Sequence, residues 1–172
     1  MADLGFFNGQ RVELVGGRIV IMSPVGAAHY TGVKLVEEAL ERAYGAGYVV
    51  RTRAPLLAPD DSEPEPDAAV VPGHPRDYRA AHPSRALLVV EVADSTLAYD
   101  RTTKASLYAA ADVPEYWVPN LVDRRLEVHR DPASLPGEAF GAGYRTLSLY
   151  LPGDTVPPAG GRAPVPVDDL LP

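Results

Sequence analysis

Residues 86–92 read Ala-Leu-Leu-Val-Val-Glu-Val, and this stretch does most to decide the fold. The five residues 86–90 are all apolar and do not alternate with polar side chains, which is typical of a strand covered on both faces. The run ends in Glu91, and an ionised carboxylate at the end of a buried strand is costly unless it is paired or bound to a cation. The stretch therefore predicts a central strand that delivers a functional carboxylate to one end of a sheet.

A second acidic residue, Asp67, precedes another apolar run, Ala-Ala-Val-Val at 68–71. The segment before it, residues 58–66, contains three prolines and four acidic side chains, which predicts a stiff, polar loop with few ladder hydrogen bonds. We therefore expect Asp67 at the start of a short strand. Taken alone, Asp67 is more typical of a carboxylate that caps a turn, and its surroundings are what favour a functional role.

The N-terminal part predicts a β-hairpin followed by a helix and a strand. Two β-branched runs at 11–15 and 18–22 flank Gly16-Gly17, which can take the positive φ values of a tight turn. From about His29 to Tyr44 apolar residues recur at three- and four-residue spacing, as on an amphipathic helix. A strand is then expected at 48–53.

Downstream of Glu91, residues 94–96 offer N-caps for a helix that runs to about residue 111 and carries Lys104. Further strands are expected at 114–118, 125–129 and 144–150, the first two as a hairpin containing Trp117 in the core. Beyond residue 152 the chain is rich in Pro and Gly, and we expect it to wrap the surface more than build a core.

These elements predict an α/β (α+β) fold, a mixed β-sheet flanked by helices with an N-terminal β-hairpin. A length of 172 residues suits one domain and is too short for two ordinary ones. We expect a single domain over residues 1–172, with its core at about 11–150 and a tail at 151–172. No cysteine is present, so any metal must be held by oxygen or imidazole, and the composition suits a reducing cytoplasm. No secretion signal or membrane segment is expected.

Asp67, Glu91 and Lys104 lie on consecutive predicted elements and are the residue types that metal-assisted hydrolysis of a phosphodiester needs. Magnesium takes about six oxygens and is usually held by one or two carboxylates, with water and substrate phosphate completing the shell. An ammonium group can orient the attacking water or stabilise the developing anion. The alternative for Lys104 is an ordinary i,i+4 ion pair with Asp100 on an exposed helix, worth only about 0.3–0.5 kcal/mol.

The ordered motifs resemble the PD-(D/E)XK nucleases, and within them the Uma-two family of endonucleases. The residues that carry the resemblance span most of positions 11–130: Glu-Leu-Val-Gly-Gly-Arg at 13–18, Ser-Glu-Pro-Glu-Pro-Asp at 62–67, Val-Val-Glu-Val-Ala-Asp-Ser-Thr at 89–96, Asp-Arg-Thr-Thr-Lys at 100–104, Leu-Tyr at 107–108, and Val-Pro-Glu-Tyr-Trp-Val at 113–118. Two departures are Gly16-Gly17, where the family usually has Asp-Gly, and Pro119-Asn120, where it usually has Val-Asp. The second is expected to loosen the final hairpin.

The resemblance implies a restriction-endonuclease-like fold and hydrolysis of DNA with Mg²⁺ or Mn²⁺. It implies Asp67, Glu91 and the main-chain carbonyl of Val92 as metal ligands, and Lys104 as the catalytic lysine that has moved from the strand to the next helix. A homodimer is also implied, since cutting both strands of a duplex calls for two sites related by symmetry.

Four further residues are weighed as second-tier site residues: Glu13, His29, Asp100 and Tyr108. Glu13 and His29 match positions that the family tends to retain. A histidine that opens a helix is nevertheless more often a surface or capping residue. Tyr108 lies one turn after Lys104, where packing is favoured over contact with substrate.

A net charge of −7 argues against a protein that binds nucleic acid through general electrostatic attraction. One rival reading is therefore a nuclease fold that has lost turnover and binds nucleic acid or protein. A second is an interaction protein without any metal site.

Overall fold

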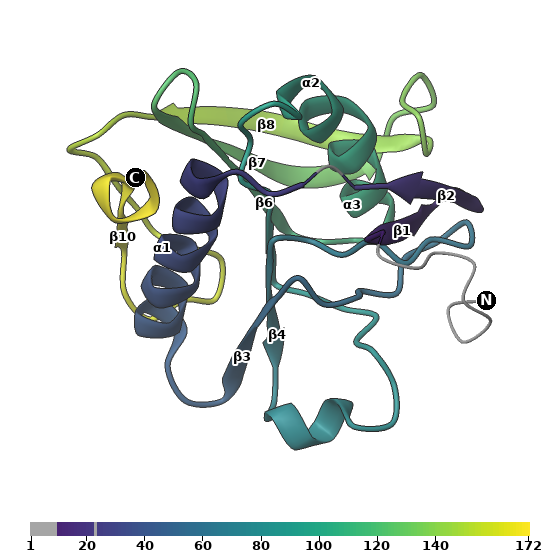
Figure 1. Ribbon diagram of the computed structural model, residues 1–172, viewed down its shortest axis with the longest axis horizontal. Helices are drawn as coiled ribbons and strands as arrows, with labels where there is room; N and C mark the ends of the chain where they lie inside the picture. Colours follow the sequence, from purple (N-terminus) through teal and green to yellow (C-terminus); the bar gives the residue numbers. More distant parts are fainter. Residues whose placement is uncertain (1–9, 23) are drawn as a thin grey trace.

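The computed structural model describes residues 10–22 and 24–172, and a six-stranded mixed sheet is its centre (Figure 1). The strands stand in the order β3-β4-β5-β6-β7-β8, and only the β5–β6 pair is parallel. Their bounds are β3 (Tyr48–Thr52), β4 (Ala68–Pro72), β5 (Leu88–Val90), β6 (Glu115–Asn120), β7 (Arg125–Ser134) and β8 (Ala142–Tyr150). The mixed sheet and all of its predicted strands are confirmed, although β5 is shorter than predicted.

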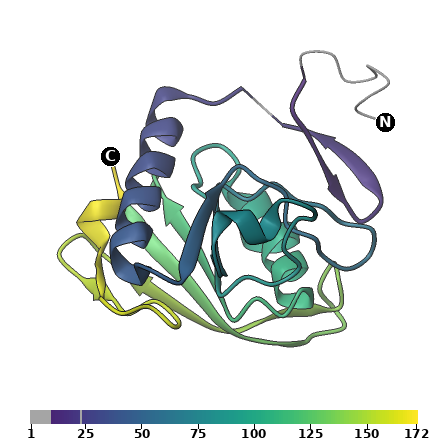
Figure 2. The same cartoon turned by 90° about the horizontal axis from the view of Figure 1, so that it is seen from below.

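The N-terminal hairpin is also confirmed, with β1 (Val12–Val15) paired to β2 (Arg18–Ile21). Gly16 and Gly17 form its turn at φ 56° and 69°, a region that glycine enters without steric cost. The hairpin is not part of the main sheet and projects to one side of it (Figure 2). Reciprocal main-chain hydrogen bonds between Leu14 and Glu63 hold it to the acidic loop.

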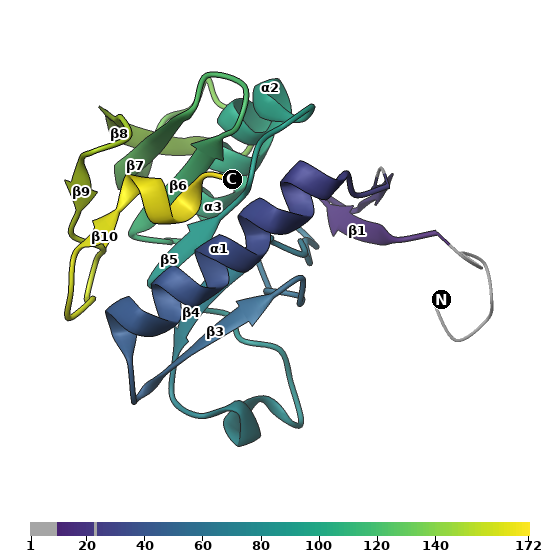
Figure 3. The same cartoon turned by 60° about the vertical axis from the view of Figure 1, so that its left-hand side comes forward.

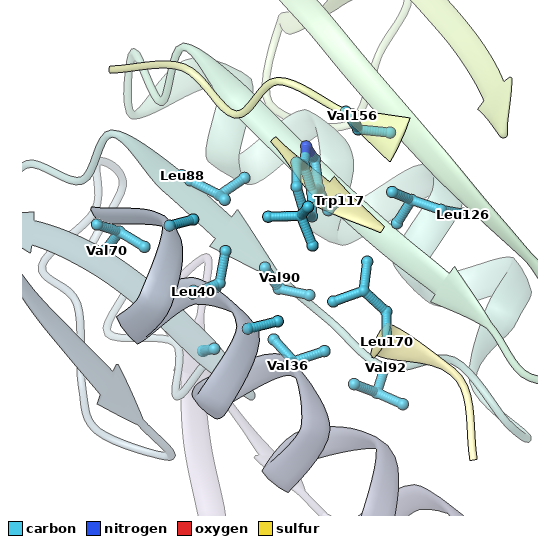
Figure 4. Close-up of a cluster of buried hydrophobic side chains, with 14 of the residues drawn as sticks. Val36, Leu40, Val70, Leu88, Val90, Val92, Trp117, Leu126, Val156 and Leu170 are labelled. Carbon is cyan, nitrogen blue, oxygen red and sulfur yellow. The ribbon is translucent and has the colours of Figure 1, made fainter. Parts of the chain in front are cut away.

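Helix α1 (Ala27–Tyr44) covers one face of the sheet with the apolar stripe that its sequence predicts. Val36 and Leu40 are fully buried, and Figure 4 shows them facing the strand residues Val70, Val90 and Trp117. Burying a side chain of this kind contributes about 1.5–3 kcal/mol. This packing fixes the start of α1 above the end of β5, where the candidate site lies.

The prediction for the C-terminal tail is wrong, because part of it completes this same core. The tail forms a small hairpin, β9 (Thr155–Val156) with β10 (Val165–Pro166), and then the 3₁₀ turn η4 (Val167–Leu170). It lies beside α1 in Figure 3, and Val156, Val165, Val167 and Leu170 are at most 2% exposed. The prolines between these residues break up the regular spacing that would have marked them as core.

A helical segment covers the other face of the sheet, where one continuous helix was predicted. It consists of α2 (Leu97–Tyr99), the π-helical turn η3 (Asp100–Lys104) and α3 (Ala105–Ala110). A π turn holds one extra residue per hydrogen-bonded ring, so it shifts the direction of the side chains that follow. The segment packs on the sheet through residues such as Tyr108, against Val89 and Tyr116.

Two further findings concern the rest of the chain. Pro119-Asn120 does not loosen the β6–β7 hairpin: β6 continues to Asn120, which pairs with Arg125 and anchors Asp123 and Glu127 through its side-chain amide. The polar connection between β4 and β5 contains the 3₁₀ turn η2 (Pro75–Tyr78). Among the described residues, no helix has the length and apolar character needed to cross a membrane.

Candidate active site

Asp67 and Glu91 meet where β4 and β5 separate. The last paired residues of these antiparallel strands are Ala68 and Val90. One position further on, the Asp67 amide donates to Glu91 Oε2 at 3.2 Å, and the Val92 amide donates to Asp67 Oδ2 at 2.9 Å. Each carboxylate thus accepts from the main chain of the other strand, which holds the two acids side by side at one end of the sheet.

The other oxygen of Glu91 accepts two hydrogen bonds from the helical segment. Lys104 Nζ donates to Glu91 Oε1 at 3.0 Å, and the Tyr108 hydroxyl donates to the same oxygen at 2.6 Å. Lys104 Nζ also donates to Glu13 Oε2 at 2.6 Å, so the hairpin contributes a third carboxylate to the cluster. Glu13, Glu91 and Lys104 are all buried.

Burial sets the electrostatics of this cluster. It raises the pKa of Glu91 well above the usual carboxylate value, although the Lys104 charge acts in the opposite direction. Burial alone would lower the pKa of Lys104, but the charges and hydrogen bonds of Glu91 and Glu13 outweigh it and raise that pKa. The lysine is therefore held as an ammonium, and the carboxylate of Glu91 beside it is protonated more readily than an exposed glutamate.

Lys104 ends the π turn and faces Glu91 and Glu13, not Asp100. The simple i,i+4 pair weighed from the sequence is not formed: Asp100 accepts from the Thr96 hydroxyl at 2.6 Å, while Lys104 pairs with Glu13 and Glu91. Asp100 is itself buried, and burial raises its pKa. Turns of this kind often occur at functional sites.

His29 also contacts the cluster; it is half-buried, and the N-cap of α1 is Gly26. Its Nε2 lies 3.0 Å from Asp67 Oδ2, and this hydrogen bond raises the pKa of His29 against the effect of burial. Gly32, one turn further along α1, permits the approach: a Cβ there would lie 3.0 Å from Cγ1 of Val92. Tyr108 is fully buried, as packing predicted, and also holds Glu91.

A pocket of about 190 Å³ opens beside these side chains. Asp67, Glu91 and Lys104 line it together with His29 and Glu13, while the hairpin and the start of the α2 segment supply its other walls. All the predicted site residues except Tyr108 and Val92 line this one pocket, Asp100 included. Sequence spacing could not show the Glu13–Lys104 contact, because 91 residues separate the two.

The donor set fits a hard divalent cation of the kind that the fold implies. Two carboxylates from adjacent strands are oxygen donors, and magnesium is usually held by only one or two of these plus water. Among residues 10–22 and 24–172 no group of three or more His, Asp or Glu side chains is arranged to hold a metal ion. Asp67 is in contact with the His29 imidazole, and Glu91 with the Lys104 ammonium.

The fold and this site define a restriction-endonuclease-like protein. A crystal structure described as that of "a putative nuclease belonging to DUF820 from Anabaena variabilis ATCC 29413" matches with a TM-score of 0.69 at 12% sequence identity, over 92% of this chain and 88% of that one. A family model described as "Uma2: Putative restriction endonuclease" matches residues 2–158, and the chain belongs to that family. No curated protein sequence matches this chain.

Proposed function

We propose that the protein is a divalent-metal-dependent endonuclease that hydrolyses DNA phosphodiester bonds. The observation that carries the proposal is the meeting of Asp67, Glu91 and Lys104 in one hydrogen-bonded cluster that lines a pocket. Membership of a family of nucleases supports the same reaction class. Two acids and an amine from three consecutive elements are the set that the reaction needs.

Asp67, Glu91 and the main-chain carbonyl of Val92 are the proposed ligands of Mg²⁺ or Mn²⁺. When bound, such a cation lowers the pKa of a water molecule and neutralises charge on the phosphoryl oxygens. The Val92 amide donates a hydrogen bond to Asp67, and the Asp67 amide donates one to Glu91. These two hydrogen bonds hold the proposed ligands in a fixed arrangement. Ligand orientation of this kind reduces the reorganisation that binding requires.

Lys104 is the proposed catalytic residue. Its ammonium is held charged next to Glu91 and can donate a hydrogen bond to a phosphoryl oxygen or to the attacking water. Glu13 occupies a second Nζ hydrogen bond and keeps the amine directed toward the cluster. His29 and Tyr108 are positioning residues in this scheme, because they contact Asp67 and Glu91 and hold these carboxylates in place.

Cleavage of plasmid and single-stranded DNA with magnesium or manganese tests the proposal. Asp67→Asn and Glu91→Gln keep the shape of each side chain and remove its charge, so both variants should lose cleavage. Asp60→Asn is the matched control, since Asp60 is an exposed acid of the neighbouring loop. Undiminished cleavage by both site variants would contradict the mechanism.

A fold that has lost turnover and binds nucleic acid or protein is the second candidate. The net charge of −7 favours it, because it provides no general attraction for DNA. Wild-type protein that binds manganese in calorimetry but cuts no substrate would favour this candidate. No manganese binding near millimolar concentration would favour an interaction protein without a metal site.

A homodimer is part of the proposal, since two copies related by a twofold axis would present two sites to the two strands of a duplex. Sedimentation of the full chain with and without a duplex tests it. A monomer in both conditions would limit the proposed activity to nicking or to single strands.

A further inference from the structure

Arg53 is fixed directly beside Asp67 by its main chain. It follows the last residue of β3, and its amide donates to the carbonyls of Pro66 at 3.1 Å and Asp67 at 3.4 Å. Its φ is 49°, in the left-handed region that an arginine rarely adopts. This backbone turn takes Arg53 out of the regular strand at the point where the chain passes the proposed metal ligand.

Two guanidinium nitrogens of Arg53 have no acceptor among residues 10–22 and 24–172, in contrast to those of Arg130 and Arg101. Its Nε and Nη2 atoms are buried and form no hydrogen bond with the residues that the structure describes. In Arg130 the same two atoms donate hydrogen bonds to Glu115 at 3.0 and 3.2 Å, and in Arg101 they donate to Glu127. Because a buried, unpaired donor is costly, the empty edge of Arg53 indicates a partner that binds from outside.

The surroundings of Arg53 place its side chain near the proposed site, although it does not line the pocket itself. Its guanidinium stacks on the ring of Tyr30 at 5.6 Å, and Tyr30 is 53% exposed. Tyr30 directly follows His29, whose Nε2 contacts Asp67. Arg53 itself is only partly buried, so rotation of its outer torsions along the exposed ring can bring the Nε and Nη2 edge to solvent.

We propose that Arg53 binds a phosphate of the DNA strand adjacent to the phosphate that is cut. The inference rests on the proposed function and adds a substrate anchor on the α1 side of Asp67. The planar Nε and Nη2 fork matches two oxygens of a phosphate, which a lysine cannot do. In an acidic chain such a local cation supplies the attraction that the net charge does not.

Arg51 is a closely matched control. It lies on the same strand, two residues before Arg53, and its guanidinium stacks on Tyr78 at 5.5 Å. Its Nη2 already has partners within the chain, at 3.5 Å from the Pro55 carbonyl and 3.1 Å from Nδ1 of His82. Arg51→Ala and Arg53→Ala therefore remove the same charge and the same kind of stacking, and differ in the unpaired edge.

The test measures binding of the full chain to a labelled duplex oligonucleotide without divalent metal, over a series of potassium chloride concentrations. We expect Arg53→Ala to weaken binding roughly ten-fold and to reduce the slope of log K against log salt by about 0.9, the value for one phosphate contact. Arg51→Ala should leave both quantities unchanged. Arg53→Lys should keep the slope and lose part of the affinity, since its charge remains and its fork does not.

Equal slopes and affinities for Arg53→Ala and wild type would overturn the inference. A lowered melting temperature of Arg53→Ala with an unchanged salt slope would also overturn it, because Arg53 would then be structural. Tighter binding of an RNA duplex of the same sequence than of DNA would overturn the substrate class. If Arg53→Ala does not affect binding but DNA is cleaved in an Asp67-dependent way, the inference fails and the proposed nuclease function stands. If the salt slope depends on Arg53 but no DNA is cleaved, the proposed nuclease function fails and the phosphate contact stands.

Discussion

Two buried glutamates of the same sheet, Glu91 after β5 and Glu127 in β7, differ in how their charge is balanced. Glu127 receives hydrogen bonds from Arg101, Asn120 and Arg125, and these outweigh the effect of burial and lower the pKa of Glu127 to about 2. Burial dominates at Glu91 and raises its pKa, with Lys104 as its cationic neighbour. Both side chains are nearly inaccessible to solvent, but Glu91 lies deeper in the protein and has fewer cationic donors, and together these two differences give opposite shifts.

The difference separates a structural carboxylate from one suited to chemistry. Glu127 is saturated with donors, so it has no capacity for a further ligand and acts as a link between strands and the helical segment. Glu91 lines a pocket and shares its one cationic partner, Lys104, with Glu13, so a further cation beside it would relieve the cost of its burial. Changing each glutamate in turn tests this contrast.

Glu91→Gln should give the largest effect on activity. We expect DNA cleavage to fall by about 1,000-fold or more, because the variant removes a proposed metal ligand. The melting temperature should change little, since a carboxylate whose pKa is raised gains little from being charged. Cleavage rates at saturating magnesium and thermal unfolding measure the two effects, and a collapse in stability with normal cleavage would reverse the assignment.

Glu127→Gln should show the opposite behaviour. The amide cannot balance Arg101 and Arg125, and because both arginines are partly exposed we expect a loss of about 2–3 kcal/mol in the free energy of unfolding. Cleavage per folded molecule should remain close to wild type. Urea unfolding combined with activity on the same sample checks this, and a catalytic loss without instability would show that Glu127 belongs to the site.

The acid sensitivity of the fold follows from the lowered pKa of Glu127. A folded pKa of about 2 against an unfolded value near 4.5 means that its stabilisation is complete above the unfolded pKa and is lost as pH falls toward the folded one. Between pH 5 and pH 3 we expect wild type to lose about 2 kcal/mol through this group. Glu127→Gln should lack that part of the acid dependence; parallel stability curves for the two proteins would be inconsistent with it.

Much of the fold was predictable because its signals are local. Apolar periodicity located α1 and the strands, and the unbroken run at 86–90 marked β5 as central. Strand ends also placed Asp67 and Glu91 at the same edge of the sheet. The catalytic roles of these residues stay predictions until they are tested.

The remaining features depend on contacts that periodicity does not encode. The apolar pattern of the helix gave no sign of the π turn at 100–104, which ends at Lys104. The contact between His29 and Asp67 could not be predicted, because the two residues are 38 positions apart and lie on different elements. Alternation at 125–129 predicted the strand, but it could not show that Arg101 donates hydrogen bonds to Glu127, which is buried.

His29→Ala should have a smaller effect than the loss of a ligand. Groups that orient metal ligands typically contribute about 10–100-fold to metal affinity or activity, and His29 contacts the proposed ligand Asp67. We expect cleavage to fall within that range and to be partly restored by higher manganese concentrations. His74→Ala, at an exposed position outside the pocket, is the control, and equal rates for the two variants would remove His29 from the site.

Addition of magnesium to the apo protein should produce the smallest effect, a rise in thermal stability. A ligand present at ten times its dissociation constant and bound only to the folded state stabilises it by about 1.4 kcal/mol, a shift of a few degrees for a chain of this size. The shift should persist in Glu127→Gln and disappear in Asp67→Asn, because only the second variant alters the carboxylate pair. A magnesium shift that survived in Asp67→Asn would place the cation elsewhere and remove the contrast between Glu91 and Glu127.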